Sequence, residues 1–267
     1  MTEHVLHTCT IKGPAPSFTA SCCPPCLSQV TLAEQDLLPF SNLQSLQDLA
    51  ISTLNDTYVE PLLSAQVAAG MTSLTSLDLS GCHVSCIRHV GSSRALRKLT
   101  MSCPATSQQE LGAHEWAAVG KLTRLKQLHL LNAEVCSASP EFCAAVSELV
   151  QLQSIGAGLL SGDVVSALTV CTGLTELVGC WQQGSGAEEG VTLPSVTRLR
   201  GIGGVPPFSA FPNLATVLQS GALSASVFVH MVQYCAGLQK LQVCSKLISY
   251  NNNNNNNASG PPPNPVT

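Results

Sequence analysis

Residues 74–84 are the most regular segment of the chain and read Leu74-Thr75-Ser76-Leu77-Asp78-Leu79-Ser80-Gly81-Cys82-His83-Val84. Its leucines are spaced as L-x-x-L-x-L, and Cys82 and Val84 stand where this recurring motif has Asn or Cys and then an aliphatic residue. A strand turns alternate side chains to opposite faces, so Leu77 and Leu79 point inward while Ser76, Asp78 and Ser80 point outward. The stretch therefore predicts a short strand with one buried face.

The same spacing of aliphatic residues recurs along the chain. Nine copies have their first anchor at residues 46, 74, 96, 125, 152, 174, 196, 214 and 238. The first two anchors are Leu, Ile or Val in every copy, whereas the third decays to Ala157, Gly179, Gly201 and Gln219 in copies five to eight. Because one copy cannot bury its leucines alone, the copies are expected to stack, bury one continuous core and form a parallel sheet.

Between strands the chain must return on the other side of the sheet. Ser139, Pro140 and Glu141 are typical of a helix start, because Ser caps the first N–H groups and Pro is favoured in the first turn. Apolar residues at helical spacing then continue to Leu149. We expect further helical returns over 109–119, 163–170 and 223–234, and irregular returns at the proline-rich segments 193–194 and 206–212.

With these repeats the chain resembles the leucine-rich repeat family, in particular the cysteine-containing subtype of F-box-type and plant or algal proteins. The resemblance rests on Leu77-Asp78-Leu79-Ser80-Gly81-Cys82 and on segments 171–177 and 235–241, where a Cys precedes the first Leu by three. It covers residues 31–248 and implies an α/β solenoid with a concave parallel sheet and helices or irregular returns on the convex face. Cys82 alone fills the Asn/Cys position well, which predicts an irregular solenoid.

The two ends of the chain do not fit the repeat. Residues 1–30 are expected to form an irregular or disordered leader, with no recognisable set of F-box helices. Residues 249–267 contain seven consecutive Asn and a proline-rich segment, and are expected to be disordered. The leader offers candidate zinc ligands, but the usual second Cys-x-x-Cys is absent, so no metal is expected. The candidates are His4, His7, Cys9, Cys22, Cys23 and Cys26.

Composition excludes several classes of function. The chain is 45% hydrophobic and only 4% aromatic, so the core is aliphatic. A net charge of −4 with 12 Lys and Arg argues against a nucleic-acid partner. A transmembrane helix needs about 20 consecutive apolar residues, and the apolar stretches of this chain are far shorter, so no membrane partner is expected. Thirteen cysteines without a signal peptide indicate buried free thiols in a reducing compartment, and we expect a cytoplasmic protein.

No pattern of residues predicts catalysis. Histidines and acids are scattered, without a Ser-His-Asp or paired-carboxylate arrangement. The glycine-rich segments 156–158 and 201–204 lack the rest of a phosphate-binding motif, so no cofactor is expected. Cys82, His83 and Cys86 are better explained as repeat residues than as a redox site, since free Cys is usually buried. A metal- or thiol-dependent enzyme using the N-terminal cysteines stays open as an alternative.

The outward residues of the strands are the candidate binding surface, because curved repeat proteins bind partners on the concave face. One predicted row is Ala50, Asp78, Thr100, His129, Gly156, Val178, Arg200, Leu218 and Gln242, and the row before it is Asp48, Ser76, Lys98, Gln127, Ser154, Glu176, Arg198, Thr216 and Lys240. The predicted partner-binding residues are Asp78, Lys98, Thr100, His129, Glu176, Arg198, Arg200, Lys240 and Trp181. Gly156 is expected to leave room for a partner, and for Trp181 packing at the solenoid edge is the alternative.

The sequence therefore predicts a non-catalytic scaffold that binds another protein on the concave face of the solenoid. The resemblance implies two narrower roles. One is the substrate-recognition part of an SCF-type ubiquitin ligase, and the other is a structural component of a cytoskeletal or ciliary axoneme assembly. A cytoskeletal or ciliary location rests on the resemblance alone.

Overall fold

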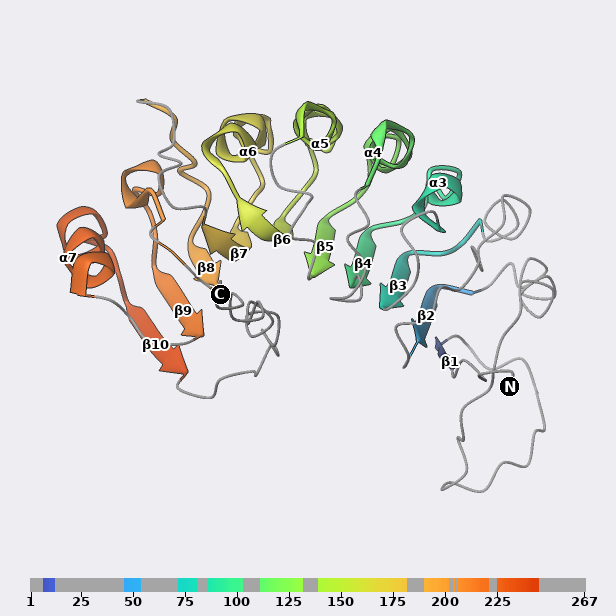
Figure 1. The fold of residues 1–267 in the computed structure, drawn as a ribbon, viewed down its shortest axis with the longest axis horizontal. Coiled ribbons are helices and arrows are strands. Elements are labelled where there is room, and N and C mark those ends of the chain that lie inside the picture. Colours follow the sequence, from blue (N-terminus) through green and yellow to red (C-terminus); the bar gives the residue numbers. More distant parts are fainter. Residues whose placement is uncertain are drawn as a thin grey trace, which may run out of the picture.

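The computed structural model describes residues 7–12, 46–53, 72–80, 86–102, 111–131, 139–181, 190–201, 204, 206–220 and 225–244. In these residues ten strands form one sheet in chain order (Figure 1). The strands are β1 (His7–Lys12), β2 (Asp48–Thr53), β3 (Ser76–Ser80), β4 (Lys98–Ser102), β5 (Gln127–Leu131), β6 (Ser154–Leu160), β7 (Glu176–Trp181), β8 (Arg198–Arg200), β9 (Thr216–Ser220) and β10 (Lys240–Cys244).

Strands β2 to β10 are all parallel, which confirms the predicted solenoid. The register also confirms both predicted rows. Asp78, for example, lies opposite Ala50 on one side and Thr100 on the other. Figure 1 shows the strands along the inner side of an arc and the helices along its outer side.

The helical returns lie close to where the sequence predicts them. They are α3 (Ile87–Val90), α4 (Ala113–Gly120), α5 (Pro140–Ser147), α6 (Gly162–Ala167), α7 (Ala225–Tyr234) and the 3₁₀ helices η3 (Leu168–Val170) and η4 (Phe208–Ala210). At the start of α5, Ser139 Oγ accepts the backbone N–H of Phe142 at 3.1 Å, as expected of an N-cap. The short α3 was not among the predicted helices. Within the described residues no helix has the length and apolar character needed to cross a bilayer.

Residues 7–12 differ from the predicted irregular leader. They form β1, which pairs antiparallel with β2 from His7 opposite Thr53 to Lys12 opposite Asp48. Thr8, Thr10 and Ile11 are β-branched and favour strands. The strand therefore provides the open edge of β2 with backbone partners. The remaining residues of 1–30, and the predicted disordered tail at 249–267, lie outside the described residues.

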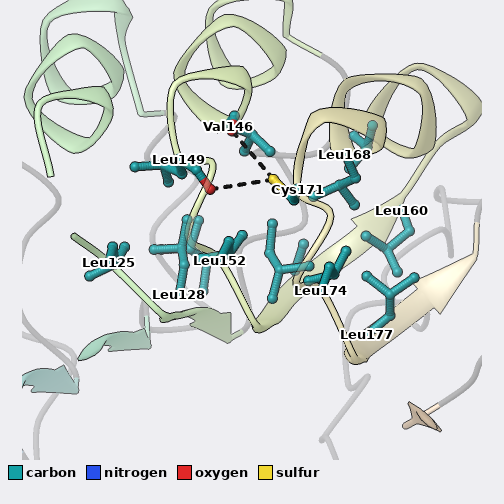
Figure 2. Packing of buried hydrophobic residues seen from close by; sticks show 14 of the residues in the cluster. Leu125, Leu128, Val146, Leu149, Leu152, Leu160, Leu168, Cys171, Leu174 and Leu177 are labelled. Carbon is teal, nitrogen blue, oxygen red and sulfur yellow. Dashed lines mark hydrogen bonds between the residues drawn. The ribbon is translucent and has the colours of Figure 1, made fainter. Parts of the chain in front are cut away.

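The core is one continuous aliphatic cluster between the sheet and the returns. Cys171 joins two layers of it, because its buried Sγ–H points at the carbonyl oxygens of Leu149, at 3.4 Å, and Val146, at 3.9 Å (Figure 2). Burial raises the pKa of the Cys171 thiol to about 11. The thiol thus stays protonated and donates to these two carbonyl oxygens at the end of α5 and just after it, each of which also accepts a backbone N–H.

The strand register changes where the third anchor is small. Pairing of β6 with β7 passes from Ala157 opposite Gly179 directly to Leu159 opposite Cys180, so β6 has one extra residue. Gly179 has φ = +148°, and a Cβ placed on it would lie 2.0 Å from the carbonyl oxygen of Ala157. Only glycine fits this position.

Alternation of side chains along β7 places Trp181 in the core, on the same face as Leu177 and Gly179. Gly179 and Gly201 stand at the third anchors of neighbouring copies and provide no side chain to fill the interior. Beyond the bulge, Leu160 and Trp181 are paired and both are buried. The indole of Trp181 packs on Phe211, with ring centroids 5.8 Å apart.

Candidate binding surface on the strands

Three rows of residues make up the surface that we call the strand face. The first-position row runs from Asp48 to Lys240 and the central row from Ala50 to Gln242, as predicted. A leading row precedes the strands and is held by backbone hydrogen bonds from each repeat to the one before. It consists of Gln47, Thr75, Arg97, Lys126, Gln153, Thr175, Thr197, Ala215 and Gln239.

A hydrogen-bonded chain of side chains crosses β5, β6 and β7 on this face. Nε2 of His129 lies 2.9 Å from Oγ of Ser154, and that hydroxyl donates to Oε2 of Glu176 at 3.1 Å. The serine has a single hydrogen, which goes to the carboxylate. Nε2 of His129 must therefore be the donor in its contact with the serine.

Two arginines lie on the other side of Glu176. Nη1 of Arg200 donates to Oε1 of Glu176 at 3.4 Å, and Nη2 of Arg198 lies 3.9 Å from the same oxygen. Both arginine side chains are about half exposed, at 52% for Arg198 and 49% for Arg200. A guanidinium has five N–H donors, so most donors of this pair are not used by Glu176.

The His129 ring lies over Gly156 of the next strand. A Cβ on Gly156 would come within 3.1 Å of Cδ2 of His129, so the missing side chain makes room for the imidazole. The expectation that Gly156 leaves a vacant position for a partner is therefore corrected. The space is taken by a residue of the chain itself.

The surroundings of His129 keep its ring neutral. Burial lowers its pKa below the ordinary value of 6.5, the charge of Glu176 opposes this, and the charges of Lys98 and Arg200 add to it. The neutral ring with hydrogen on Nε2 agrees with its donation to Ser154.

The His129, Ser154 and Glu176 arrangement is not that of a catalytic triad. In a triad the histidine accepts the serine proton and the carboxylate binds the other ring nitrogen. Here the carboxylate binds the serine, and the histidine donates to it. The serine is also buried. This chain of contacts therefore positions side chains and does not activate a nucleophile.

The other predicted site residues divide into exposed and buried ones. Lys98 and Lys240 are exposed, and Asp78 accepts a hydrogen bond from Ser80 Oγ at 2.6 Å. Thr100 is only 9% exposed. Their positions in the rows match the prediction, while their part in binding stays a prediction.

Trp181 requires a correction. Its side chain is 3% exposed and belongs to the core, so it offers no surface to a partner. The physical reason is the alternation of side chains along β7, which turns Trp181 to the same inner face as Leu177, where its indole fills space that two glycines leave. Sequence reasoning also left Ser154 and the leading row out of the site, although the same register places them there.

The candidate metal and thiol residues lie only partly within the described part of the chain. Among the residues that the structure describes, no three His, Cys, Asp or Glu side chains lie together as metal ligands. Of the candidate zinc ligands, His7 and Cys9 lie on β1, and His4, Cys22, Cys23 and Cys26 lie outside the described residues. Cys82 and His83 also lie outside them, and Cys86 is buried at the start of α3.

Comparisons with known proteins find likeness among solved structures only. No family model matches the chain, and no curated protein matches it. Internalin C2 of Listeria monocytogenes is 15% identical with a TM-score of 0.47, over 81% of this chain and 84% of that one. A second internalin of Listeria monocytogenes is 15% identical with a TM-score of 0.44, over 82% and 64%. A leucine-rich repeat protein of Leptospira interrogans is 13% identical with a TM-score of 0.37, over 81% and 64%.

At these identities and TM-scores the fold assignment rests on the arrangement of strands and helices in the structure of this chain, not on the comparisons. Nine parallel strands, in one register over their first three residues, have aliphatic residues pointing inward and helices on the outer side of the arc. The membership in a cysteine-containing subtype stays a prediction. The chain has the fold of a leucine-rich repeat solenoid.

Proposed function

We propose that the protein is a non-catalytic scaffold that binds another protein on the strand face, centred on Glu176, Arg198 and Arg200. The observation that supports this most is the fixed chain of contacts from His129 through Ser154 to Glu176. It holds the carboxylate in place, and the carboxylate in turn orients two half-exposed arginines. The leucine-rich repeat fold is typically used for protein binding, which agrees with this role.

The energetic argument concerns the cost of ordering side chains on binding. Immobilising a flexible side chain at an interface costs about 0.5–1.5 kcal/mol. Arg198 and Arg200 meet part of that cost before a partner arrives, because Glu176 restricts both. Their unused N–H donors match the planar carboxylate of a partner's Asp or Glu, a contact for which arginine is well suited.

A photo-crosslinking experiment tests the position of the surface. A photoreactive phenylalanine analogue replaces Val178, which lies in the central row between Gly156 and Arg200. A second variant has the analogue at the exposed Thr169, on the helical side. We expect a crosslinked protein from position 178 and none from position 169. Crosslinking from position 169 alone would contradict the proposal.

Charge reversal then tests the residues. Arg198→Glu with Arg200→Glu should abolish the product formed at position 178. Lys121→Glu with Arg124→Glu changes the net charge equally at exposed positions between α4 and β5, and should preserve the product. Circular dichroism of both variants verifies that they fold. A product that survives the Arg198 and Arg200 reversal would remove these residues from the site.

We also propose a reducing, cytoplasmic location. The buried thiols of Cys171 and Cys235, whose pKa burial raises, are consistent with it. The two narrower roles, in an SCF-type ligase or in an axoneme, rest on the sequence resemblance. Co-purification of a Skp-type adaptor would support the first, and axonemal localisation of a tagged chain would support the second. Failure to bind any adaptor would remove the ligase role.

A further inference from the structure

The strand face and the whole chain differ in the sign of their charge. The three rows contain six of the 12 Lys and Arg residues and three of the 16 acids, whereas the net charge of the chain is −4. The bases are Arg97, Lys98, Lys126, Arg198, Arg200 and Lys240, and the acids are Asp48, Asp78 and Glu176. Positive charge is therefore concentrated on the proposed binding surface.

Half of these bases meet in one groove at the start of the strands. The groove has a volume of about 540 Å³ and is open to solvent. It is lined by Gln47, Thr75, Ser76, Arg97, Lys98, Lys126, Gln127 and Gln153. No acidic residue is part of this lining. In the described part of the chain no carboxylate lies within 4 Å of the nitrogens of Arg97, Lys98 or Lys126.

The backbone carbonyls of Arg97 and Lys126 already have partners within the sheet. The carbonyl oxygen of Arg97 accepts the N–H groups of Lys126, at 2.8 Å, and Gln127, at 3.0 Å. The carbonyl oxygen of Lys126 accepts those of Gln153 and Ser154 in the same way. Since these carbonyls already have partners, they do not compete for the side-chain donors. Side-chain cations and amide groups therefore dominate the groove.

We infer that this groove binds an acidic segment of the partner protein, rich in Asp and Glu. The inference rests on the proposed function, because it names the chemistry of a protein partner. The three cations provide the charge complement, and Gln47, Gln127 and Gln153 provide neutral donors for further carboxylates. The lining contains no aromatic residue, whereas surfaces that bind single-stranded nucleic acid stack bases on aromatic rings. The composition of the groove therefore favours a peptide.

Fluorescence anisotropy with a labelled peptide of alternating Glu and Gly tests the groove. The test variant combines Arg97→Gln, Lys98→Gln and Lys126→Gln. The matched control combines Arg94→Gln, Lys121→Gln and Arg124→Gln, which are exposed, lie outside the lining and change the net charge equally. Exposed ion pairs are individually weak, so losing three of them should weaken binding about tenfold. The control should bind the peptide as tightly as the unmodified chain does. Added salt should weaken the binding of the peptide to each of these two proteins.

The outcomes separate this inference from the proposed function. If the two triple variants bind the peptide with equal affinity, the inference that the groove binds an acidic segment is wrong. It is also wrong if an unlabelled oligonucleotide displaces the peptide at a lower concentration than polyglutamate does. If crosslinking at position 178 still captures a protein in that case, the strand face remains the docking surface. Groove-dependent peptide binding without any crosslink at position 178 would support the groove and contradict the wider proposal.

Discussion

Replacing Gly179 by Ala should destabilise the solenoid more than any other single methyl addition at a described glycine. The position combines a φ of +148° with a carbonyl oxygen, that of Ala157, 2.0 Å from the site of the new Cβ. A residue other than Gly in such a region costs about 1–3 kcal/mol in backbone strain alone. The oxygen must also move by more than about 1 Å to restore an ordinary van der Waals contact, which disturbs the pairing of β6 with β7.

The two contributions together predict a loss of about 3–4 kcal/mol in the free energy of unfolding. For a chain of this size, each kcal/mol lowers the melting temperature by about 2–4 °C, so a drop of about 10 °C is expected. Two glycines provide matched controls. Gly190 has φ = +93° and no described atom within 4 Å of an added methyl, so Gly190→Ala should cost about 1–2 kcal/mol of strain only. Gly173→Ala has ordinary φ and space, and should stabilise by about 0.4–1 kcal/mol.

Urea unfolding followed by circular dichroism ranks the three variants. Fluorescence adds a local readout, because the chain has only two tryptophans, Trp116 and Trp181. In a Trp116→Phe background the emission of Trp181 should be that of a buried indole, and Gly179→Ala should shift it to longer wavelength. If Gly179→Ala matches Gly173→Ala in stability and leaves the emission unchanged, the close approach of Gly179 to the Ala157 carbonyl does not constrain the pairing of β6 with β7 beside Trp181.

Two further predictions concern charge and thiol chemistry. Arg88→Ala should lower the free energy of unfolding by about 2–3 kcal/mol, because it removes the side-chain partner of the buried Glu115. Arg94→Ala, at an exposed position, should lower it by less than about 0.5 kcal/mol in the same urea assay. Burial raises the pKa of Glu115, but the hydrogen bond and charge of Arg88, together with backbone N–H groups, outweigh this effect and hold that pKa below 4.5. The stability that results is present above pH 4.5 and is lost as the pH falls towards the pKa of Glu115 in the folded state. Arg88→Ala should move this loss of stability to higher pH. Brief iodoacetamide treatment at pH 8, followed by peptide mass mapping, should label the exposed Cys180 and spare the buried Cys171, whose pKa of about 11 makes its thiolate about a hundredfold scarcer than that of an ordinary thiol. Equal labelling of the two would contradict the burial of Cys171.

The rows of the strand face were predictable because a parallel sheet of repeats has one register. Once Leu77, Leu99 and Leu128 are aligned, the outward residues beside them are aligned as well. The contacts within the face were not predictable. His129 and Ser154 stand in different rows, and their contact depends on a rotamer that crosses from β5 to β6 over a glycine. Spacing along the chain contains no information about such a rotamer.

The groove, too, was only partly predictable from the sequence. The bases Arg97, Lys98 and Lys126 are visible in the sequence, but only Lys98 belongs to a row predicted to bind. The other two precede their strands, where the motif gives no reason to expect a surface. The backbone hydrogen bond between the repeats, from Lys126 N–H to the Arg97 carbonyl, places them side by side.

The spacing of aliphatic residues was enough to predict the number of strands in the parallel sheet, the alignment of their first residues and the placement of most helices, because these aliphatic residues must all reach one interior. Where that spacing fails, the packing depends on contacts between neighbouring strands that the spacing does not specify. At Gly179 the anchor has no side chain, and the interior there is filled by Trp181, two residues further along β7, and by Leu160, which the bulge in β6 places opposite it. Packing demands a filled core, but which neighbouring residue fills it depends on the three-dimensional path of the chain.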